Sequence, residues 1–362
     1  MYKRLLTKAD GRALALYARA PIDGNPGAPS PSELPHMPTP HLRWHPLRAE
    51  WVAYAVHRQN RTFLPPAEYN PLAPTVDPAN PTEVPAGEWD VAVFENLFPT
   101  FAQNAHEAPD LPIPTAPARG ACEVVVFTQD PHTSLGRLPL WHIELLIDVW
   151  ADRYTELGAR DDVAYVFPFE NRGVEVGVTL SHPHGQIYAY PFVPPIPLRA
   201  LEQQRAYFEQ HQFGLLEHFI AQEISNTVRL LYHGSEVVAF TPICARYAYE
   251  VWVAPVRAAE SFAALTGSER TDFARALKTV LLKLDGLWQR PMPYILAVQQ
   301  APTDGEPHPE AHLHIQIYPA LRMRDRLKYL AGSEIGAGVF TADTLPEVAV
   351  THLQAVVVDV DA

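Results

Sequence analysis

The sequence carries one short pattern twice, first as His182-Pro-His-Gly-Gln-Ile-Tyr188 and later as His312-Leu-His-Ile-Gln-Ile-Tyr318. Each copy closes a stretch of similar organisation, with apolar strand-like runs followed by an amphipathic helix pattern. The period of this duplication is far too long for a solenoid repeat. The repeated motif therefore predicts two similar α/β halves that pack together.

The periodic segments of the two halves follow the same order. Strand-like runs are at 91–94 and 123–127 in the first half and at 237–240 and 250–253 in the second. Helix patterns are at 138–150, at 198–228 (a pair) and at 266–284. The last of these opens with the capping box Thr266-Gly-Ser-Glu269. We expect an α/β (α+β) fold of duplicated halves, each an antiparallel sheet with helices on one face. The expected boundaries are 1–42 for a proline-rich N-terminal arm, 43–195 for the first half, 196–230 for a helical connection and 231–362 for the second half.

Composition limits the class of protein. The 362 residues include 28 Lys and Arg against 41 Asp and Glu, a net charge of −13, which argues against a nucleic-acid-coating protein. No apolar run approaches the roughly 20 residues of a membrane helix. Two cysteines cannot build a disulfide framework, which favours a reducing compartment. Together, these features lead us to expect a cytoplasmic enzyme with no membrane or nucleic-acid partner. Proline is abundant at 37 residues, and its density over 20–40 predicts an extended surface arm.

The His-Pro-His-Gly-Gln string has a chemical interpretation. Residues two apart in a strand share a face, so His182, His184 and Gln186 are expected to point the same way. Pro183 would place the segment at a strand end, and Gly185 would allow close approach to the backbone. A neutral imidazole is a competent nucleophile, and a carbonyl holding its Nδ1–H would leave Nε2 free. Ordinary strand histidines or a pair of metal ligands remain alternative interpretations of His-x-His.

The fuller string, preceded by Phe169-Glu-Asn-Arg-Gly173 and Gly177-Val-Thr179, resembles the galactose-1-phosphate uridylyltransferases of the histidine-triad superfamily. The resemblance runs from about Arg43 to about Glu334. It implies that the second histidine, His184, attacks the α-phosphorus of UDP-glucose, releases glucose 1-phosphate and forms a uridylyl-histidine. Galactose 1-phosphate then takes the UMP group in a ping-pong cycle. The resemblance also implies a homodimer.

Further roles follow from the resemblance. Gln186 can donate a hydrogen bond to a phosphoryl oxygen but cannot act as an acid, which favours transfer between phosphates over hydrolysis. His182 would orient the loop or the nucleophile. The residues that match substrate-binding positions are Arg58, Arg61, Asn96, Asn171, Thr179, Lys328 and Glu334. Alone, the arginine pair could equally be a solvated face and Asn96 a turn-initiating residue.

Two metal sites of the resembled family lack ligands here, and we expect no metal cofactor. Asn70 and Ala73 stand where many relatives have zinc-binding cysteines, although His132 and His182 remain. For the second metal, His314 is kept, and the three replaced positions are Ala200, Gln299 and Gln316. A residual cluster of His308, His312 and His314 with Glu306 or Glu310 stays open as an alternative.

The first copy of the motif is expected to be the reactive one. The second copy lacks Pro183 and Gly185, and we expect bulky Ile315 to obstruct a phosphate. No Walker A or Gly-x-Gly-x-x-Gly string indicates a kinase-like or dinucleotide site. Two alternatives remain: a phosphorylase of ADP-glucose or of a diadenosine polyphosphate with the same covalent histidine, and an inactive nucleotide-binding regulator.

Overall fold

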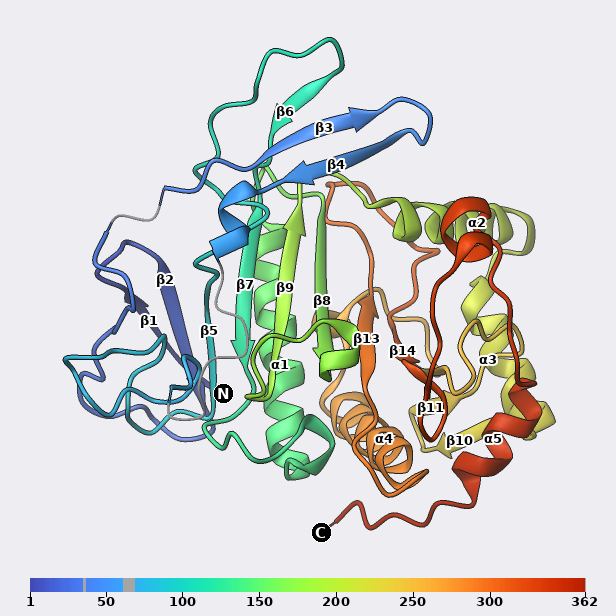
Figure 1. Ribbon diagram of the computed structural model, residues 1–362. Coiled ribbons are helices and arrows are strands. Elements are labelled where there is room, and N and C mark those ends of the chain that lie inside the picture. Colours follow the sequence, from blue (N-terminus) through green and yellow to red (C-terminus); the bar gives the residue numbers. More distant parts are fainter. Residues whose placement is uncertain (35–36, 61–68, 362) are drawn as a thin grey trace.

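One antiparallel sheet dominates the computed structural model, which describes residues 1–34, 37–60 and 69–361 (Figure 1). Its eleven strands lie in the order β1-β2-β5-β7-β9-β8-β13-β14-β12-β11-β10, and the paired neighbours run antiparallel. The strands are β1 (Tyr2–Thr7), β2 (Ala13–Ala18), β5 (Val91–Glu95), β7 (Ala121–Val126), β8 (Tyr165–Arg172), β9 (His184–Tyr190), β10 (Leu230–His233), β11 (Val237–Phe240), β12 (Val251–Pro255), β13 (Tyr294–Gln299) and β14 (His314–Pro319).

The two halves meet where β8 of the first pairs with β13 of the second. Arg172 lies opposite Tyr294 and Glu170 opposite Leu296 in this ladder. The Tyr294 hydroxyl donates to the Glu170 carboxylate at 2.8 Å, and Arg172 pairs with Asp285 at 2.7 Å. The expected duplicated antiparallel halves are confirmed, and they share one continuous sheet rather than packing as separate ones.

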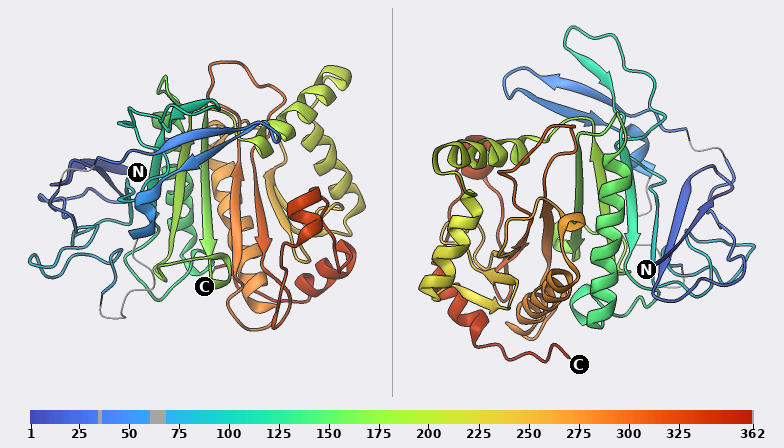
Figure 2. Two further views of the ribbon diagram at one scale, coloured as in Figure 1. Left: turned by 45° about the horizontal axis from the view of Figure 1, so that its top comes forward. Right: turned by 180° about the vertical axis from the view of Figure 1, so that it is seen from behind.

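Helices cover one face of this sheet, as expected, but at β11 and β12 a further helix packs on the opposite face, where Leu216 and Ile220 join Val238, Phe240 and Ala254 in one apolar cluster. The helices are α1 (Leu140–Gly158), α2 (Pro195–His211), α3 (Leu215–Asn226), α4 (Gly267–Gly286) and α5 (Pro346–Gln354). Helices α1 and α4 lie side by side behind the strands (Figure 2), and their apolar stripes form the main core with the sheet. The capping box that starts α4 is present, with Thr266 Oγ1 accepting from the Glu269 amide at 3.3 Å.

The N-terminal region differs from the expected arm. Residues 2–18 form a hairpin, β1 and β2, that pairs onto β5 and extends the sheet. Leu14 and Leu16 of β2 are fully buried. Proline density predicted the irregular course of residues 20–34 and 37–40, but it gave no information about the alternating apolar residues that precede them.

The face opposite α1 and α4 is open above β9. Ile187 and Ala189 point toward the helices, whereas His184, Gln186 and Tyr188 point the other way. A small sheet of β3 (His41–His45), β4 (Glu50–Tyr54) and β6 (Thr115–Pro117) projects beyond the strand ends, followed by a 3₁₀ turn at Val56–Asn60.

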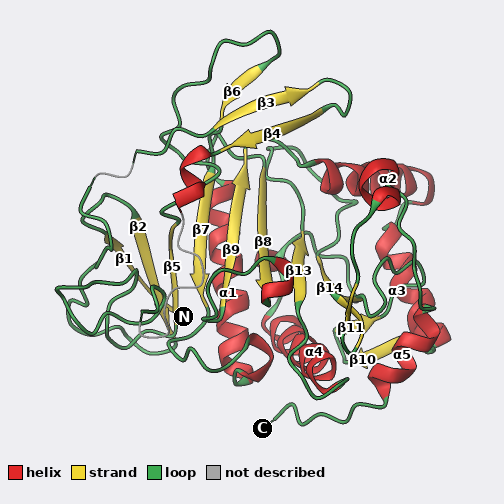
Figure 3. Cartoon of the chain, in the orientation of Figure 1, coloured by secondary structure: helices red, strands yellow, loops and turns green. Residues whose placement is uncertain are grey.

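Long loops border the open face, including the stretch 69–90 before β5 (Figure 3). Strands β15 (Leu321–Met323) and β16 (Arg326–Leu327) form a hairpin, and a π turn follows at Ser333–Ala337. Further 3₁₀ turns lie at Leu135–Arg137, Val174–Val176 and Phe262–Ala264. Among the helices described, none combines the length and apolarity that crossing a bilayer requires.

Candidate active site

His184 opens strand β9 and points into a cavity. Its Nδ1 lies 2.7 Å from the carbonyl oxygen of His182, which holds the Nδ1–H tautomer and leaves Nε2 without its proton. Burial lowers the pKa of His184 below its ordinary value, so the ring is neutral near pH 7. The next residue must be small, since a Cβ at Gly185 would lie 2.8 Å from the Phe127 ring. The backbone thus presents a neutral imidazole with a free lone pair.

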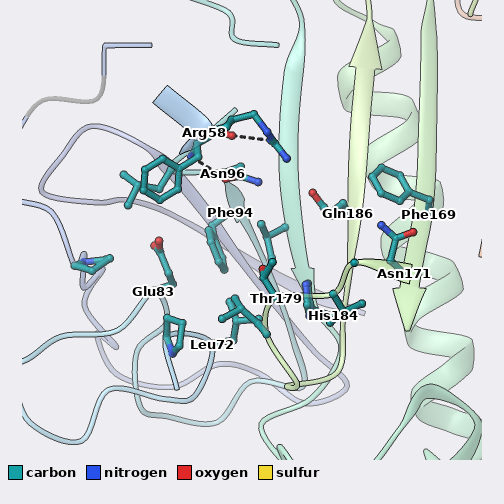
Figure 4. Close-up of a pocket in the computed structure, with 18 of the residues that line it drawn as sticks. Arg58, Leu72, Glu83, Phe94, Asn96, Phe169, Asn171, Thr179, His184 and Gln186 are labelled. Atoms are coloured by element: carbon teal, nitrogen blue, oxygen red, sulfur yellow. Dashed lines mark hydrogen bonds between the residues drawn. The ribbon is translucent and has the colours of Figure 1, made fainter. Parts of the chain in front are cut away.

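The cavity has a volume of about 430 Å³ and brings together most of the predicted site (Figure 4). Six predicted residues line it: Arg58, Asn96, Asn171, Thr179, His184 and Gln186. They come from segments far apart in the sequence, which the sheet and the loops above it bring to one place. A space of this size fits a nucleotide-sized ligand.

Gln186 lies two residues after His184 on the same face of β9. In the ladders it is opposite Val124 of β7 and Phe169 of β8, and both of these side chains also line the cavity. Its amide therefore stands beside the imidazole, in the floor of the cavity, between two apolar neighbours. This position suits a hydrogen-bond donor to an oxygen of a group bound at His184.

Arg58 and Asn96 are fixed by the same loop. Arg58 Nη1 donates to the Phe98 carbonyl at 2.8 Å and to the Tyr188 hydroxyl at 3.4 Å. Asn96 Oδ1 accepts from the Phe98 amide at 2.8 Å, so Asn96 initiates a turn and also lines the cavity. Arg58 supplies a cation to the cavity wall, whereas Arg61 lies outside the described residues.

His182 does not share the open face, contrary to expectation. The ladder of β9 begins only at His184, because Pro183 has no N–H to donate, and the chain turns there. The His182 side chain is 1% exposed and turned away, with Nε2 2.7 Å from the Thr128 carbonyl. Its carbonyl, rather than its ring, contacts the nucleophile candidate, so His182 orients His184 through the backbone.

The residues at the first family metal position do not fit a metal ion. Asn70 Nδ2 donates to His182 Nδ1 at 2.9 Å, while Asn70 Oδ1 accepts from the Leu72 amide at 3.0 Å. Both ring nitrogens of His182 are thus engaged in hydrogen bonds, and His132 is exposed. Over residues 1–34, 37–60 and 69–361, no three His, Cys, Asp or Glu side chains are grouped as metal ligands.

The second family metal position is a tight polar gap. Ala200, Gln299 and His314 do line one common space, but its volume is only about 30 Å³. His308 lies apart from this space, with Nε2 2.8 Å from Asp304 Oδ1 and Nδ1 3.3 Å from Glu310 Oε1. This donor set lacks the carboxylate and two of the histidines that the resembled site would need.

The second copy of the motif repeats the first but is closed. His314 Nδ1 lies 2.8 Å from the His312 carbonyl, and burial lowers the pKa of His314 to about 4, so its ring is also neutral. However, Gln316 Nε2 donates to His314 Nε2 at 3.1 Å. Trp252, opposite Gln316 in the ladder, packs against the His314 ring with 5.6 Å between ring centroids. The lone pair that is free at His184 is occupied here.

This closure corrects the expected role of Ile315. Ile315 occupies the position of Gly185 in the second copy of the motif. Its side chain is fully buried in the core on the helix side of the sheet and does not face the open side. Obstruction comes instead from Trp252 on the neighbouring strand. The bulk of Ile315 suggested obstruction of a phosphate, but strand alternation places its side chain on the other face of the sheet.

Lys328 and Glu334 are not brought to the cavity. Lys328 Nζ donates to Glu334 Oε1 at 3.1 Å, and the Thr341 hydroxyl donates to the same oxygen at 2.8 Å. These contacts hold the segment after β16 to the π turn, within the second half. Within this chain the two residues are partners of each other.

Several lining residues were not predicted. Pro31, Tyr69, Leu72 and Glu83 come from the long loops, and Phe169 and Tyr188 come from the strands. The two aromatics could have been found, since they lie two residues from Asn171 and Gln186 on the same faces. The loop residues carry no periodic signal that indicates their position.

Comparisons with known proteins indicate one family and one fold. Residues 32–194 match the family model "Galactose-1-phosphate uridyl transferase, N-terminal domain", and residues 200–361 match the C-terminal domain model. A galactose-1-phosphate uridylyltransferase of Thermotoga maritima is 35% identical over 88% of this chain and 99% of its own, and one of Streptomyces lividans is 34% identical over 83% and 81%. A solved uridylyltransferase structure superposes with a TM-score of 0.79 at 32% identity, covering 87% of this chain and 98% of its own. An ADP-glucose phosphorylase of Arabidopsis thaliana, at 23% identity and a TM-score of 0.67, shares the fold.

Proposed function

The chain belongs to the galactose-1-phosphate uridylyltransferase family, and we propose that it works through a uridylyl-histidine intermediate on His184. It transfers UMP between UDP-glucose and galactose 1-phosphate. The observation that carries the covalent proposal is the bond between His184 Nδ1 and the His182 carbonyl, which leaves Nε2 free at the cavity. A uridylyltransferase with its nucleophile so presented needs no separate base.

The proposed chemistry has two displacements. The Nε2 lone pair of His184 attacks the α-phosphorus of UDP-glucose, and an N–P bond forms as the P–O bond to glucose 1-phosphate breaks. The electron pair leaves on the phosphate oxygen of glucose 1-phosphate, a stable anion that needs no proton. A phosphate oxygen of galactose 1-phosphate then attacks the same phosphorus, the N–P bond breaks, and UDP-galactose leaves with the neutral imidazole restored.

The neighbouring groups support both steps. The His182 carbonyl accepts the Nδ1–H and stabilises the positive charge that the ring acquires when Nε2 is uridylylated. Gln186 is placed to donate to an oxygen of the transferring phosphoryl group, and Arg58 offsets phosphate charge. Asn171 and Thr179 line the same cavity and would bind the nucleotide and its phosphates.

Incubation with UDP-glucose alone is expected to add one uridylyl group to His184, detected as a mass gain on the peptide that contains it. The yield should be unchanged after dialysis against a metal chelator, because we propose that neither family metal is required. ADP-glucose, tested in parallel, should give little labelling. Stronger labelling by ADP-glucose would favour an adenylyl-transferring phosphorylase, and nucleotide binding without labelling would indicate an inactive regulator.

The pH dependence should reflect the lowered pKa of His184. The reactive form is the neutral ring, and burial keeps the pKa below the ordinary value of about 6.5. As pH falls, kcat/KM for UDP-glucose should therefore decline at a lower pH than it would for a nucleophile with the ordinary histidine pKa, because Nε2 is protonated only there. A profile that declines already above pH 7 would contradict a neutral, buried nucleophile.

We further propose that the protein acts as a cytoplasmic homodimer. The sheet of β3, β4 and β6 extends away from the body and carries exposed apolar side chains, including Leu47 at 92% exposure and Tyr54 at 39% (Figure 1). An apolar projection of this kind favours a partner subunit. Both cysteines, Cys122 and Cys244, are free thiols, as is usual in a reducing compartment.

A further inference from the structure

We propose that residues 1–31, which precede the matched family domain, hold one wall of the active-site cavity through a buried ion cluster on Glu83. The family model begins at residue 32. Nevertheless the hairpin β1–β2 and the segment after it are packed against the loop and strand that form this wall. The inference rests on the proposed nucleotide site and concerns what keeps that site in shape.

The Glu83 cluster consists of Lys8, Asp10, Arg12, Ser30 and Glu83. Each of these residues is less than 9% exposed, and Arg12 is fully buried. Four come from residues 1–31, whereas Glu83 belongs to the loop 69–85 and lines the cavity (Figure 4). Charged side chains are almost never buried in this way unless they are paired.

The contacts within the Glu83 cluster converge on one carboxylate. Arg12 donates from Nη2 to Glu83 Oε2 at 2.8 Å and from Nη1 to Oε1 at 3.2 Å. Lys8 Nζ donates to the Glu83 carbonyl at 2.6 Å and also pairs with the Glu83 carboxylate. Glu83 is therefore held through both its backbone and its side chain, which fixes the loop at that point.

A second layer fixes the cations themselves. Asp10 Oδ2 accepts from Arg12 Nε at 2.7 Å and from the Ser30 hydroxyl at 2.7 Å. Arg12 Nη1 also donates to the Glu95 carbonyl at the end of β5, at 2.8 Å. The hairpin turn, the segment at residue 30 and β5 are thereby joined around one guanidinium.

The Glu83 cluster reaches the cavity wall by two further contacts. Lys8 Nζ lies over the Phe94 ring, 4.5 Å from its centroid, and Phe94 lines the cavity. Pro31, directly after Ser30, lines the cavity as well. Leu14 and Leu16 of β2 pack in one apolar cluster with Phe94, and this cluster also contains Leu72 of the loop.

The net charge of the Glu83 cluster affects how well the cavity binds an anionic ligand. Two cations, Lys8 and Arg12, face two carboxylates, Asp10 and Glu83, so the cluster is neutral overall. Burial lowers the pKa of Lys8 to about 8, which still leaves it mostly charged at pH 7. Removing the Lys8 charge would leave a net negative charge in the wall of a cavity meant for nucleotide phosphates, and would release the loop.

The test compares two lysines of the same hairpin. Lys8→Met removes a cation of the Glu83 cluster, whereas Lys3→Met removes a cation that pairs with Asp152 on α1 at 2.7 Å, away from the cavity. We expect Lys8→Met to weaken UMP binding, measured by calorimetry, by about tenfold, because small displacements of a binding wall carry large effects. Lys3→Met should stay within about twofold of the wild type. Lys8→Met should also raise the KM for UDP-glucose more than it lowers kcat.

Ser30→Ala keeps the proposal testable if Lys8→Met does not fold. It deletes the hydrogen bond that the Ser30 hydroxyl donates to Asp10 and those that it accepts from Arg12 at 3.3 Å and from the Ser32 amide at 3.1 Å, and it leaves the charge pairs in place. We expect about threefold weaker UMP binding. A folded Lys8→Met protein that binds UMP like the wild type would overturn the proposal. So would an unfolded Lys8→Met together with a Ser30→Ala protein that melts earlier but binds UMP normally. If the wild type itself binds no UMP, the proposed function falls and the inference falls with it.

Discussion

Replacement of His184 by alanine is expected to abolish uridylyl transfer, with kcat reduced by about 10⁴-fold or more. The variant loses the only imidazole of the motif pair whose Nε2 faces the large cavity in the described structure. Without it the phosphorus has no nucleophile, and the ping-pong route is closed. Steady-state turnover of UDP-glucose with galactose 1-phosphate, and the loss of covalent labelling by UDP-glucose, would both report the effect.

The repeat supplies a matched control. His314 makes the same Nδ1 contact to a backbone carbonyl, but its Nε2 is bonded to Gln316. His314→Ala should therefore retain turnover within a few-fold of the wild type, apart from a loss of stability that thermal melting would detect. An inactive His314→Ala beside an active His184→Ala would mean that the second copy is the reactive one.

Replacement of Gln186 by leucine is expected to lower kcat by about 10²- to 10³-fold, as the loss of one preorganised donor does at other transferring centres. Leucine has a similar size and suits the neighbours Val124 and Phe169, so the strand should keep its packing. What disappears is the amide that steadies an oxygen of the transferring phosphoryl group. Single-turnover measurement of UDP-glucose cleavage separates this step from substrate binding.

Gln316→Leu is the corresponding change in the closed copy and should leave kcat nearly unchanged. Its amide donates to His314 and its oxygen accepts from the Tyr318 hydroxyl, so it belongs to a local network away from the cavity. If Gln186→Leu keeps full kcat and only raises the KM for UDP-glucose, the amide binds substrate equally in the ground state, and its assignment to the transition state is wrong.

The sequence indicated the candidate reactive residues because the pattern that carries them is local. His184 and Gln186 lie two apart, and strand alternation alone places them on one face. The same rule failed for His182, because the strand begins only after Pro183. The rule would also have sent Ile315 inward, had it been applied there. Local patterns were informative where the strand is regular and misleading at its end.

Long-range packing explains what could not be predicted. Glu83 lies in a loop without periodicity, and its partners Lys8 and Arg12 are more than seventy residues away. A charged residue in a sequence is normally taken to be exposed, and only the fold shows that these are buried together. The resemblance to the family placed Lys328 near substrate, but in this subunit it pairs with Glu334.

The ladder between β8 and β13 has a consequence for how the chain folds during its synthesis. During synthesis β8 is complete long before β13 leaves the ribosome, so one edge of the first half has unpaired amide and carbonyl groups in the meantime. An isolated first half would keep that edge permanently and would be prone to self-association through it. The two halves are therefore expected to fold as one cooperative unit, and neither half is expected to be stable without the other.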